Sequence, residues 1–256
     1  MNKVTLTVAI LIISSASLSY AEETSVTMPA TTPVTVAAPD NVVSYNLGVV
    51  SDYRFRGISQ TRLQPAVQGG ADYANTPTGL YVGTWLSTLK WIDDAGGNGN
   101  VEWDMYAGKK GNITENWSYD LGVLTYVYPS NDLHANADTT ELYGQIGYGP
   151  AYLKYSQAVT NLFGFANSKN SGYVDLGANI DVTNGYVINL HVGHQTVKNN
   201  SASSYSDWKI GVTKDFGFLS GSVALIGTDT KNYSGPGPDR KDLGKTALLL
   251  SAIKTF

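Results

Sequence analysis

The feature that most constrains the fold of this chain is an alternation of apolar and polar residues with a period of two, from Val42 onward. No long stretch has the period of a helix, so the pattern predicts β-strands. In residues 173–182, one face is entirely apolar and the other carries Tyr, Asp, Gly, Asn and Asp. Such a strand suits the wall of a membrane barrel and also a half-buried strand of a soluble sandwich.

Strand length and number favour the barrel. Most of the expected strands have about ten residues, the length that a tilted strand needs to cross a bilayer, whereas strands of soluble sheets have about five or six. We expect about twelve strands, at 43–56, 65–75, 78–89, 100–109, 116–128, 139–148, 151–159, 172–182, 186–196, 205–215, 217–228 and 245–256.

The connections between these strands alternate in length. Those after even-numbered strands are short, and Asn184-Gly185 is the strongest tight-hairpin signal among them. Those after odd-numbered strands are longer and polar: 58–64, 91–99, 130–138, 161–170, 197–204 and 229–244. Short turns on one rim and long loops on the other are typical of outer-membrane barrels. We therefore predict an all-β fold, a transmembrane antiparallel up-and-down β-barrel.

The two ends of the chain indicate export to a bacterial outer membrane. Residues 1–21 combine a charged start, an apolar run and a small-x-small site ending at Ala21, which predicts a signal peptide. Residues 22–42 are rich in Thr, Pro, Ala and Val without a period, so we expect a flexible periplasmic tail before a barrel at 43–256. A terminal aromatic, Phe256, resembles the signal read by the barrel-assembly machinery.

The apolar strand faces are expected to meet outer-membrane lipid, with aromatic residues near the strand ends forming interfacial girdles. This side is predicted to carry Tyr45, Leu47, Val49, Tyr53, Phe55, Leu80, Val82, Leu86, Trp103, Met105, Trp117, Tyr119, Leu121, Val123, Ile188, Leu190, Val192, Trp208, Ile210 and Val212.

The opposite faces collect the charged residues. They are too many for a dry core, because burying an unpaired charge is costly, and they fit a hydrated lumen. The residues predicted to line the pore are Asp52, Arg54, Arg56, Gln68, Asp72, Glu102, Asp104, Tyr106, Asp120, Tyr126, Glu141, Asp175, His191, Asp207 and Lys209.

Two roles stay open for these charges. Some could form structural networks, with Arg54 or Arg56 bridging Asp52, Asp72 or Asp104, and others could bias permeation. The excess of acids predicts a weak preference for cations.

The sequence gives no sign of an enzyme, a metal or a cofactor. It has no cysteine, so thiolate chemistry is excluded. His191 and His194 are three residues apart and would face opposite sides of a strand, which makes a poor metal pair. No motif sets a nucleophile beside a base. The net charge of -4 argues against a nucleic-acid partner.

Several segments together resemble the TorF family, bacterial proteins classed as porins and long catalogued as a domain of unknown function. The segments are SDYRFRGISQT (51–61), PAVQGG (65–70), GLYVGTW (79–85), Glu102-x-Asp104-x-Tyr106-Ala107-Gly108, Tyr126-x-Tyr128-Pro129, Glu141-Leu142-Tyr143, 207–212 and the closing Lys254-Thr255-Phe256. The resemblance implies an outer-membrane barrel of porin type.

We therefore expect passive diffusion of small polar solutes or ions. One alternative is a plugged structural or adhesive outer-membrane barrel, and another is a secreted soluble β-sandwich that binds a ligand. A membrane-embedded enzyme is the least favoured. The solute and the oligomeric state stay open.

Overall fold

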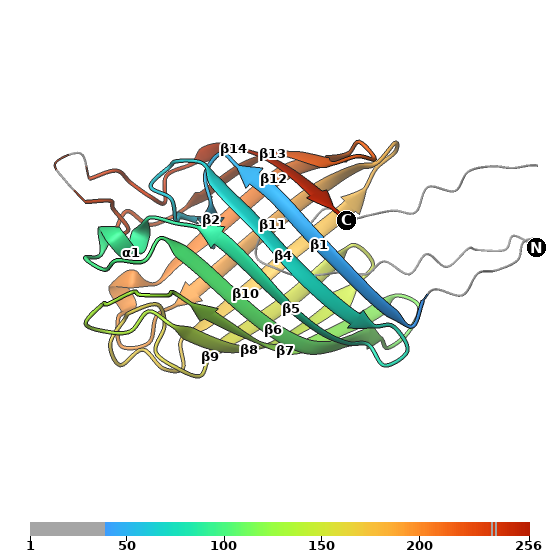
Figure 1. Ribbon diagram of the computed structural model, residues 1–256, viewed down its shortest axis with the longest axis horizontal. Helices are drawn as coiled ribbons and strands as arrows, with labels where there is room; N and C mark the ends of the chain where they lie inside the picture. The colour runs from blue at the N-terminus through green and yellow to red at the C-terminus, as the bar shows by residue number, and fades with distance from the viewer. Residues whose placement is uncertain (1–38, 237, 239) are drawn as a thin grey trace, which may run out of the picture.

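The computed structural model describes residues 39–236, 238 and 240–256. The predicted signal peptide, and the predicted tail up to residue 38, lie outside this range. The described chain forms a closed antiparallel barrel of twelve strands, in which β1 pairs with both β4 and β14 (Figure 1). The predicted fold class is thereby confirmed, and a β-sandwich is excluded.

All other neighbours in the barrel are consecutive strands. The barrel strands are β1 (Asn41–Val50), β4 (Ala66–Asn75), β5 (Leu80–Thr88), β6 (Val101–Asn112), β7 (Trp117–Val127), β8 (Thr139–Tyr148), β9 (Ala151–Ala158), β10 (Gly172–Asp181), β11 (Tyr186–Thr196), β12 (Tyr205–Asp215), β13 (Ser220–Thr228) and β14 (Ala247–Thr255). Four short elements lie in loops: β2 (Arg54–Phe55), β3 (Ile58–Ser59), α1 (Trp91–Asp94) and a 3₁₀ turn at Ser201–Ser203.

The two rims differ as the connection lengths predict. Long loops gather at one end of the barrel, and short turns gather at the other, where the C-terminus also lies (Figure 1). In the turn between β10 and β11, Asn184 and Gly185 both have positive φ, 60° and 71°. This is the backbone that a tight type I′ hairpin requires, so the hairpin predicted at this pair is confirmed.

The outer surface of the barrel is apolar. Large apolar side chains on every barrel strand are exposed, and Leu47 and Ile210 reach 58% and 57%. Aromatic residues stand near strand ends, as where Trp117 packs against Tyr148 with ring centroids 4.8 Å apart. A continuous apolar exterior of this kind needs an apolar medium around it. None of the helices in the described part of the chain is long and apolar enough to cross a membrane.

The first expected strand, 43–56, is wrong at its end. β1 stops at Val50, and residues 51–65 leave the barrel wall before β4 begins. Tyr53 and Phe55, predicted to face lipid, are only 3% and 8% exposed. The period-two pattern continues through this stretch, but Arg56 and Gly57 have φ of 46° and 80°, which a continuous strand does not allow.

Smaller differences concern strand ends. β1 begins at Asn41, two residues before the expected start of the barrel, and β6 runs on to Asn112. β13 starts only at Ser220, because Phe216 and Leu219 close a turn through a backbone hydrogen bond of 3.0 Å. The expected 91–99 loop contains α1.

Candidate functional site: a segment folded into the barrel lumen

The connection between β1 and β4 folds into the barrel instead of extending from its rim. We refer to residues 51–65 as the inward segment. Its centre is a small hairpin in which Arg54 pairs with Ser59 and Phe55 with Ile58. Arg56 and Gly57 make the turn, and their two positive φ angles give it the geometry of a tight two-residue hairpin.

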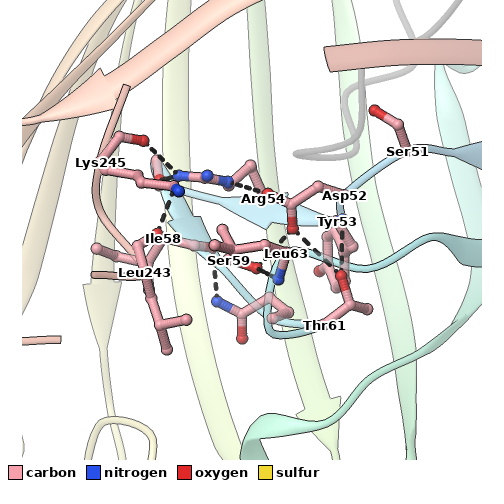
Figure 2. Close-up of polar contacts among 12 residues, drawn as sticks. Ser51, Asp52, Tyr53, Arg54, Ile58, Ser59, Thr61, Leu63, Leu243 and Lys245 are labelled. Carbon is pink, nitrogen blue, oxygen red and sulfur yellow. Dashed lines mark hydrogen bonds and ion pairs between the residues drawn. The ribbon is translucent and has the colours of Figure 1, made fainter. Parts of the chain in front are cut away.

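Asp52 organises the base of the inward segment (Figure 2). Its Oδ2 accepts from Arg54 Nε at 2.6 Å, and its Oδ1 accepts from the hydroxyls of Ser59 at 2.5 Å and Thr61 at 3.2 Å. All four side chains belong to buried residues. A carboxylate with this many donors holds the start and the end of the hairpin together.

Arg54 ties the hairpin to the last long loop of the chain. Its Nη1 donates to the backbone carbonyls of Gly57, Leu243 and Lys245 at 2.8, 2.9 and 3.1 Å, as Figure 2 shows in part. Ser59 N also donates to Leu243 O at 2.9 Å. The inward segment is therefore bound to the 229–246 connection through backbone groups.

Arg56 connects the tip of the inward segment to two strands of the barrel wall. Its Nη2 donates to Glu141 Oε2 on β8 at 2.7 Å, and its Nη1 donates to Gln195 Oε1 on β11 at 2.5 Å. The guanidinium also lies between the rings of Phe55 and Tyr173, 4.7 and 4.2 Å from their centroids. Burial opposes the charge of Arg56, but the Glu141 carboxylate outweighs it and raises the pKa of the guanidinium above its usual value.

Aromatic side chains also hold the inward segment against the barrel wall. Tyr53 packs edge-on against Trp85 of β5 with a centroid distance of 5.5 Å, and its hydroxyl donates to Glu102 of β6 at 2.7 Å. Phe55 packs against Tyr126 of β7 at 5.4 Å and against Phe163 at 5.3 Å.

These contacts place the inward segment across the lumen. It touches strands from β5 to β8 on one side and β10 and β11 on the other. The wall residues that it reaches, such as Glu102, Glu141 and Gln195, lie near the long-loop ends of their strands. The segment therefore narrows the lumen at the long-loop end.

Farther along the wall, inward-facing tyrosines and acids form a second group of contacts. Tyr106 OH donates to Asp72 at 2.6 Å, and Tyr81 OH donates to Asp120 at 2.6 Å and also meets the hydroxyl of Tyr143. These pairs join strands β4 to β8. Side chains that meet across non-neighbouring strands, as Tyr81 and Tyr143 do, can only lie inside the barrel.

On the inner face of another part of the wall, a histidine joins three strands. His191 of β11 places Nδ1 2.8 Å from Asp175 Oδ1 on β10 and Nε2 2.6 Å from Asp207 Oδ1 on β12. Tyr173 OH also donates to Asp207, at 2.9 Å. That tyrosine lies over Gly193, where a Cβ would stand 2.1 Å from the hydroxyl, so a larger residue there would require the Tyr173 side chain to move.

The structure thus divides the predicted pore-lining residues into two groups. Asp52, Arg54 and Arg56 lie on the inward segment and not on a wall strand, which corrects their predicted place. Those that lie on barrel strands, among the partly or fully buried side chains, are Gln68, Asp72, Glu102, Asp104, Tyr106, Asp120, Tyr126, Glu141, Asp175, His191, Asp207 and Lys209.

The suggested ion pairs are right in one case. Arg54 pairs with Asp52, whereas Arg56 pairs with Glu141, which lies 85 positions away in the sequence. The prediction also left out Trp85, Tyr173 and Gln195, which hold the segment. Trp85 has the same parity as the inward-facing Tyr81, so alternation along β5 could have identified it.

Comparison with solved structures supports the fold and nothing finer. One solved structure, described as "Unveiling the Mechanism Behind the in-meso Crystallization of Membrane Proteins", is 7% identical with a TM-score of 0.50, over 84% of this chain and 83% of its own. A variant of the Rh. blastica porin is 9% identical with a TM-score of 0.39, over 74% of this chain and 55% of its own. Acinetobacter baumannii OccAB3 is 11% identical with a TM-score of 0.41, over 86% and 66%.

Sequence comparison gives a family but no curated relative. No curated protein matches the chain. None of these matching proteins or families bears the name TorF, so the resemblance to the TorF family stays a prediction. A family model described as "Bacterial protein of unknown function (Gcw_chp)" matches residues 34–256, and the chain belongs to this family.

Proposed function

We propose that this protein is a channel of the bacterial outer membrane that passes small polar solutes or ions. The observation that carries the proposal is the contrast between the two faces of one closed barrel. The outer face exposes large apolar side chains, and the inner face carries carboxylates, amines and hydroxyls from most strands. A barrel built only for stability has no need of so many ionisable groups inside, because each must be paired or hydrated.

The inward segment would act as the constriction of this channel. Its polar and aromatic side chains meet opposite parts of the wall at the long-loop end, so a solute would have to pass beside Arg56 and Tyr53. A constriction lined in this way favours small solutes.

The lining would favour cations weakly. The inner wall brings Asp72, Glu102, Asp104, Asp120 and Asp175 toward the lumen, and its bases are fewer. Two of the arginines, Arg54 and Arg56, are already engaged with carboxylates. The negative excess would raise the local concentration of cations over anions.

A plugged structural or adhesive barrel is the second candidate. It is favoured by the depth at which the inward segment is buried: every residue from Asp52 to Thr61 is buried. If this arrangement is permanent and complete, the long loops rather than the lumen would carry the function.

Single-channel recording decides between the two candidates. The refolded protein is inserted in a planar bilayer with a KCl gradient, beside a variant whose residues 53–63 are replaced by a short Gly-Ser linker. Discrete steps of the unmodified protein, with a reversal potential on the cation side, support the channel. Steps from the linker variant alone favour the plugged barrel. If neither folded barrel gives steps, the channel proposal is wrong.

A further inference from the structure

Two acidic side chains of β6 are buried inside the barrel without a basic partner. Glu102 and Asp104 stand two residues apart on the inner face and are 1% and 4% exposed. Within the described residues, neither makes an ion pair with a lysine, arginine or histidine. Arg54 and Arg56 of the inward segment pair with Asp52 and Glu141 instead.

The two carboxylates differ in their hydrogen bonds. Glu102 accepts from the hydroxyl of Tyr53 at 2.7 Å. Asp104 Oδ1 is buried and has no hydrogen-bond partner. A buried carboxylate oxygen without a donor is destabilising unless a positive charge or a proton compensates it.

The surroundings of Asp104 are aromatic. In the register of the sheet it stands opposite Trp85 of β5 on one side and opposite Tyr126 of β7 on the other. Tyr53 of the inward segment packs against the same Trp85. Aromatic faces attract cations that shed part of their hydration shell, and carboxylate oxygens supply the charge.

We propose that Glu102 and Asp104 form a binding site for one small monovalent cation of the alkali-metal class, beneath Tyr53 of the inward segment. A divalent ion fits less well. Mg²⁺ gives up its waters reluctantly, whereas the aromatic rings opposite Asp104 favour a cation that sheds part of its hydration shell.

The role of this site in permeation rests on the proposed function. In a conducting barrel, a cation held at the site would occupy the constriction. Binding itself does not require that the barrel conducts. The two ideas can therefore fail separately.

The test is a K⁺ titration of the detergent-solubilised full chain. KCl replaces N-methyl-D-glucamine chloride at constant ionic strength, and tryptophan fluorescence is recorded because Trp85 lies next to Asp104. We expect a saturable change. Asp104→Asn and Glu102→Gln should each raise the half-saturating K⁺ concentration by about tenfold or more, the effect of losing one charged contact. Glu115→Gln, in an exposed short turn, is the matched control and should not alter it.

Two results would overturn the proposal. One is a response that is absent, or that is unchanged in both β6 variants when heat-modifiability shows them folded. The other is an infrared carbonyl band of a protonated carboxylic acid that Asp104→Asn removes, since a proton would then occupy the place of the cation. Saturable K⁺ binding by a barrel that gives no current would leave the site standing and refute only the channel.

Discussion

Arg56 Nη2 lies 2.7 Å from Glu141 Oε2, and this contact joins the β1–β4 connection to a strand on the far side of the barrel. In barrel order, β8 is separated from β1 by β4, β5, β6 and β7, so the pair spans the lumen. Both side chains are almost completely buried. This pair therefore helps to fix how far the tip of the inward segment reaches across the lumen.

Removing Arg56 should loosen the inward segment and enlarge the pore. Among the described residues, Arg56→Ala leaves the buried Glu141 with one long hydrogen bond, of 3.4 Å from Tyr126 OH. Loss of one partner from a buried pair costs about 3 kcal/mol or more of unfolding free energy. We expect this loss in denaturant unfolding in detergent micelles, together with a higher single-channel conductance.

Two variants make the Arg56 experiment specific. Arg56→Ala combined with Glu141→Gln should be less destabilised than the sum of the single changes, because no unpaired charge remains. Arg62→Ala removes a pair with Asp94 whose arginine is 38% exposed, so it should cost only about 1 kcal/mol or less. If the losses of unfolding free energy caused by Arg56→Ala and Glu141→Gln simply add in the double variant, the two side chains are not directly coupled.

Gly57 allows the tip of the inward segment to approach the wall. It has a φ of 80°, and a Cβ at this position would stand 2.6 Å from Thr228 Cγ2 and 2.7 Å from Asp207 Cβ. Gly57→Ala should therefore displace the tip and raise the conductance without removing a charge. Backbone strain adds a cost of about 1–3 kcal/mol.

Gly217→Ala separates the strain of Gly57→Ala from its steric clash. Gly217 has nearly the same φ, 81°, in a short turn where a Cβ would meet no atom within 4 Å. It should lower stability without changing conductance. If both alanine variants conduct like the unmodified protein, contact between Gly57 and the wall does not set the pore size.

Most of the barrel could be predicted from the sequence because its pattern is local. Alternation decides which face of β10 points outward, and Asn184-Gly185 decides where β10 turns into β11. The wall strands follow from such signals, because the exterior must be apolar along its whole height.

The inward segment could not be predicted in this way. Asp52, Tyr53, Arg54 and Phe55 alternate like a strand, yet their partners include Glu102, Tyr126 and Leu243, far away in the sequence. A run of alternating residues satisfies the strand pattern equally well on a wall or inside the lumen. Only these long-range contacts distinguish the two, and a single sequence does not show them.

His191 should carry two ring protons. Both ring nitrogens lie within hydrogen-bond distance of carboxylate oxygens, of Asp175 and Asp207. Ionised carboxylates only accept, so both nitrogens must donate. Nitrogen NMR of labelled protein at neutral pH should show an imidazolium, and a neutral ring would contradict this arrangement.

Mutation gives a second test of this histidine. His191→Gln has both of its donors on one nitrogen and cannot reach Asp175 and Asp207 as the two ring nitrogens do. The free energy of unfolding should therefore fall by about 2 kcal/mol. His194 lies on the same strand but is exposed, with one contact to Ser206. His194→Gln should change stability by about 0.5 kcal/mol or less.

A charge on the outer face of the barrel tests its orientation in the bilayer. Leu176 stands in the middle of β10 and is exposed on the apolar exterior. Leu176→Arg should cost about 2–4 kcal/mol of unfolding free energy in lipid, the range for arginine near the bilayer midplane. Ser222→Arg places the same group on the inner face, where Ser222 meets Ser251, and should cost less because water can reach it. Equal costs for the two variants, measured by urea unfolding in vesicles, would mean that the apolar exterior of the barrel is not embedded in lipid.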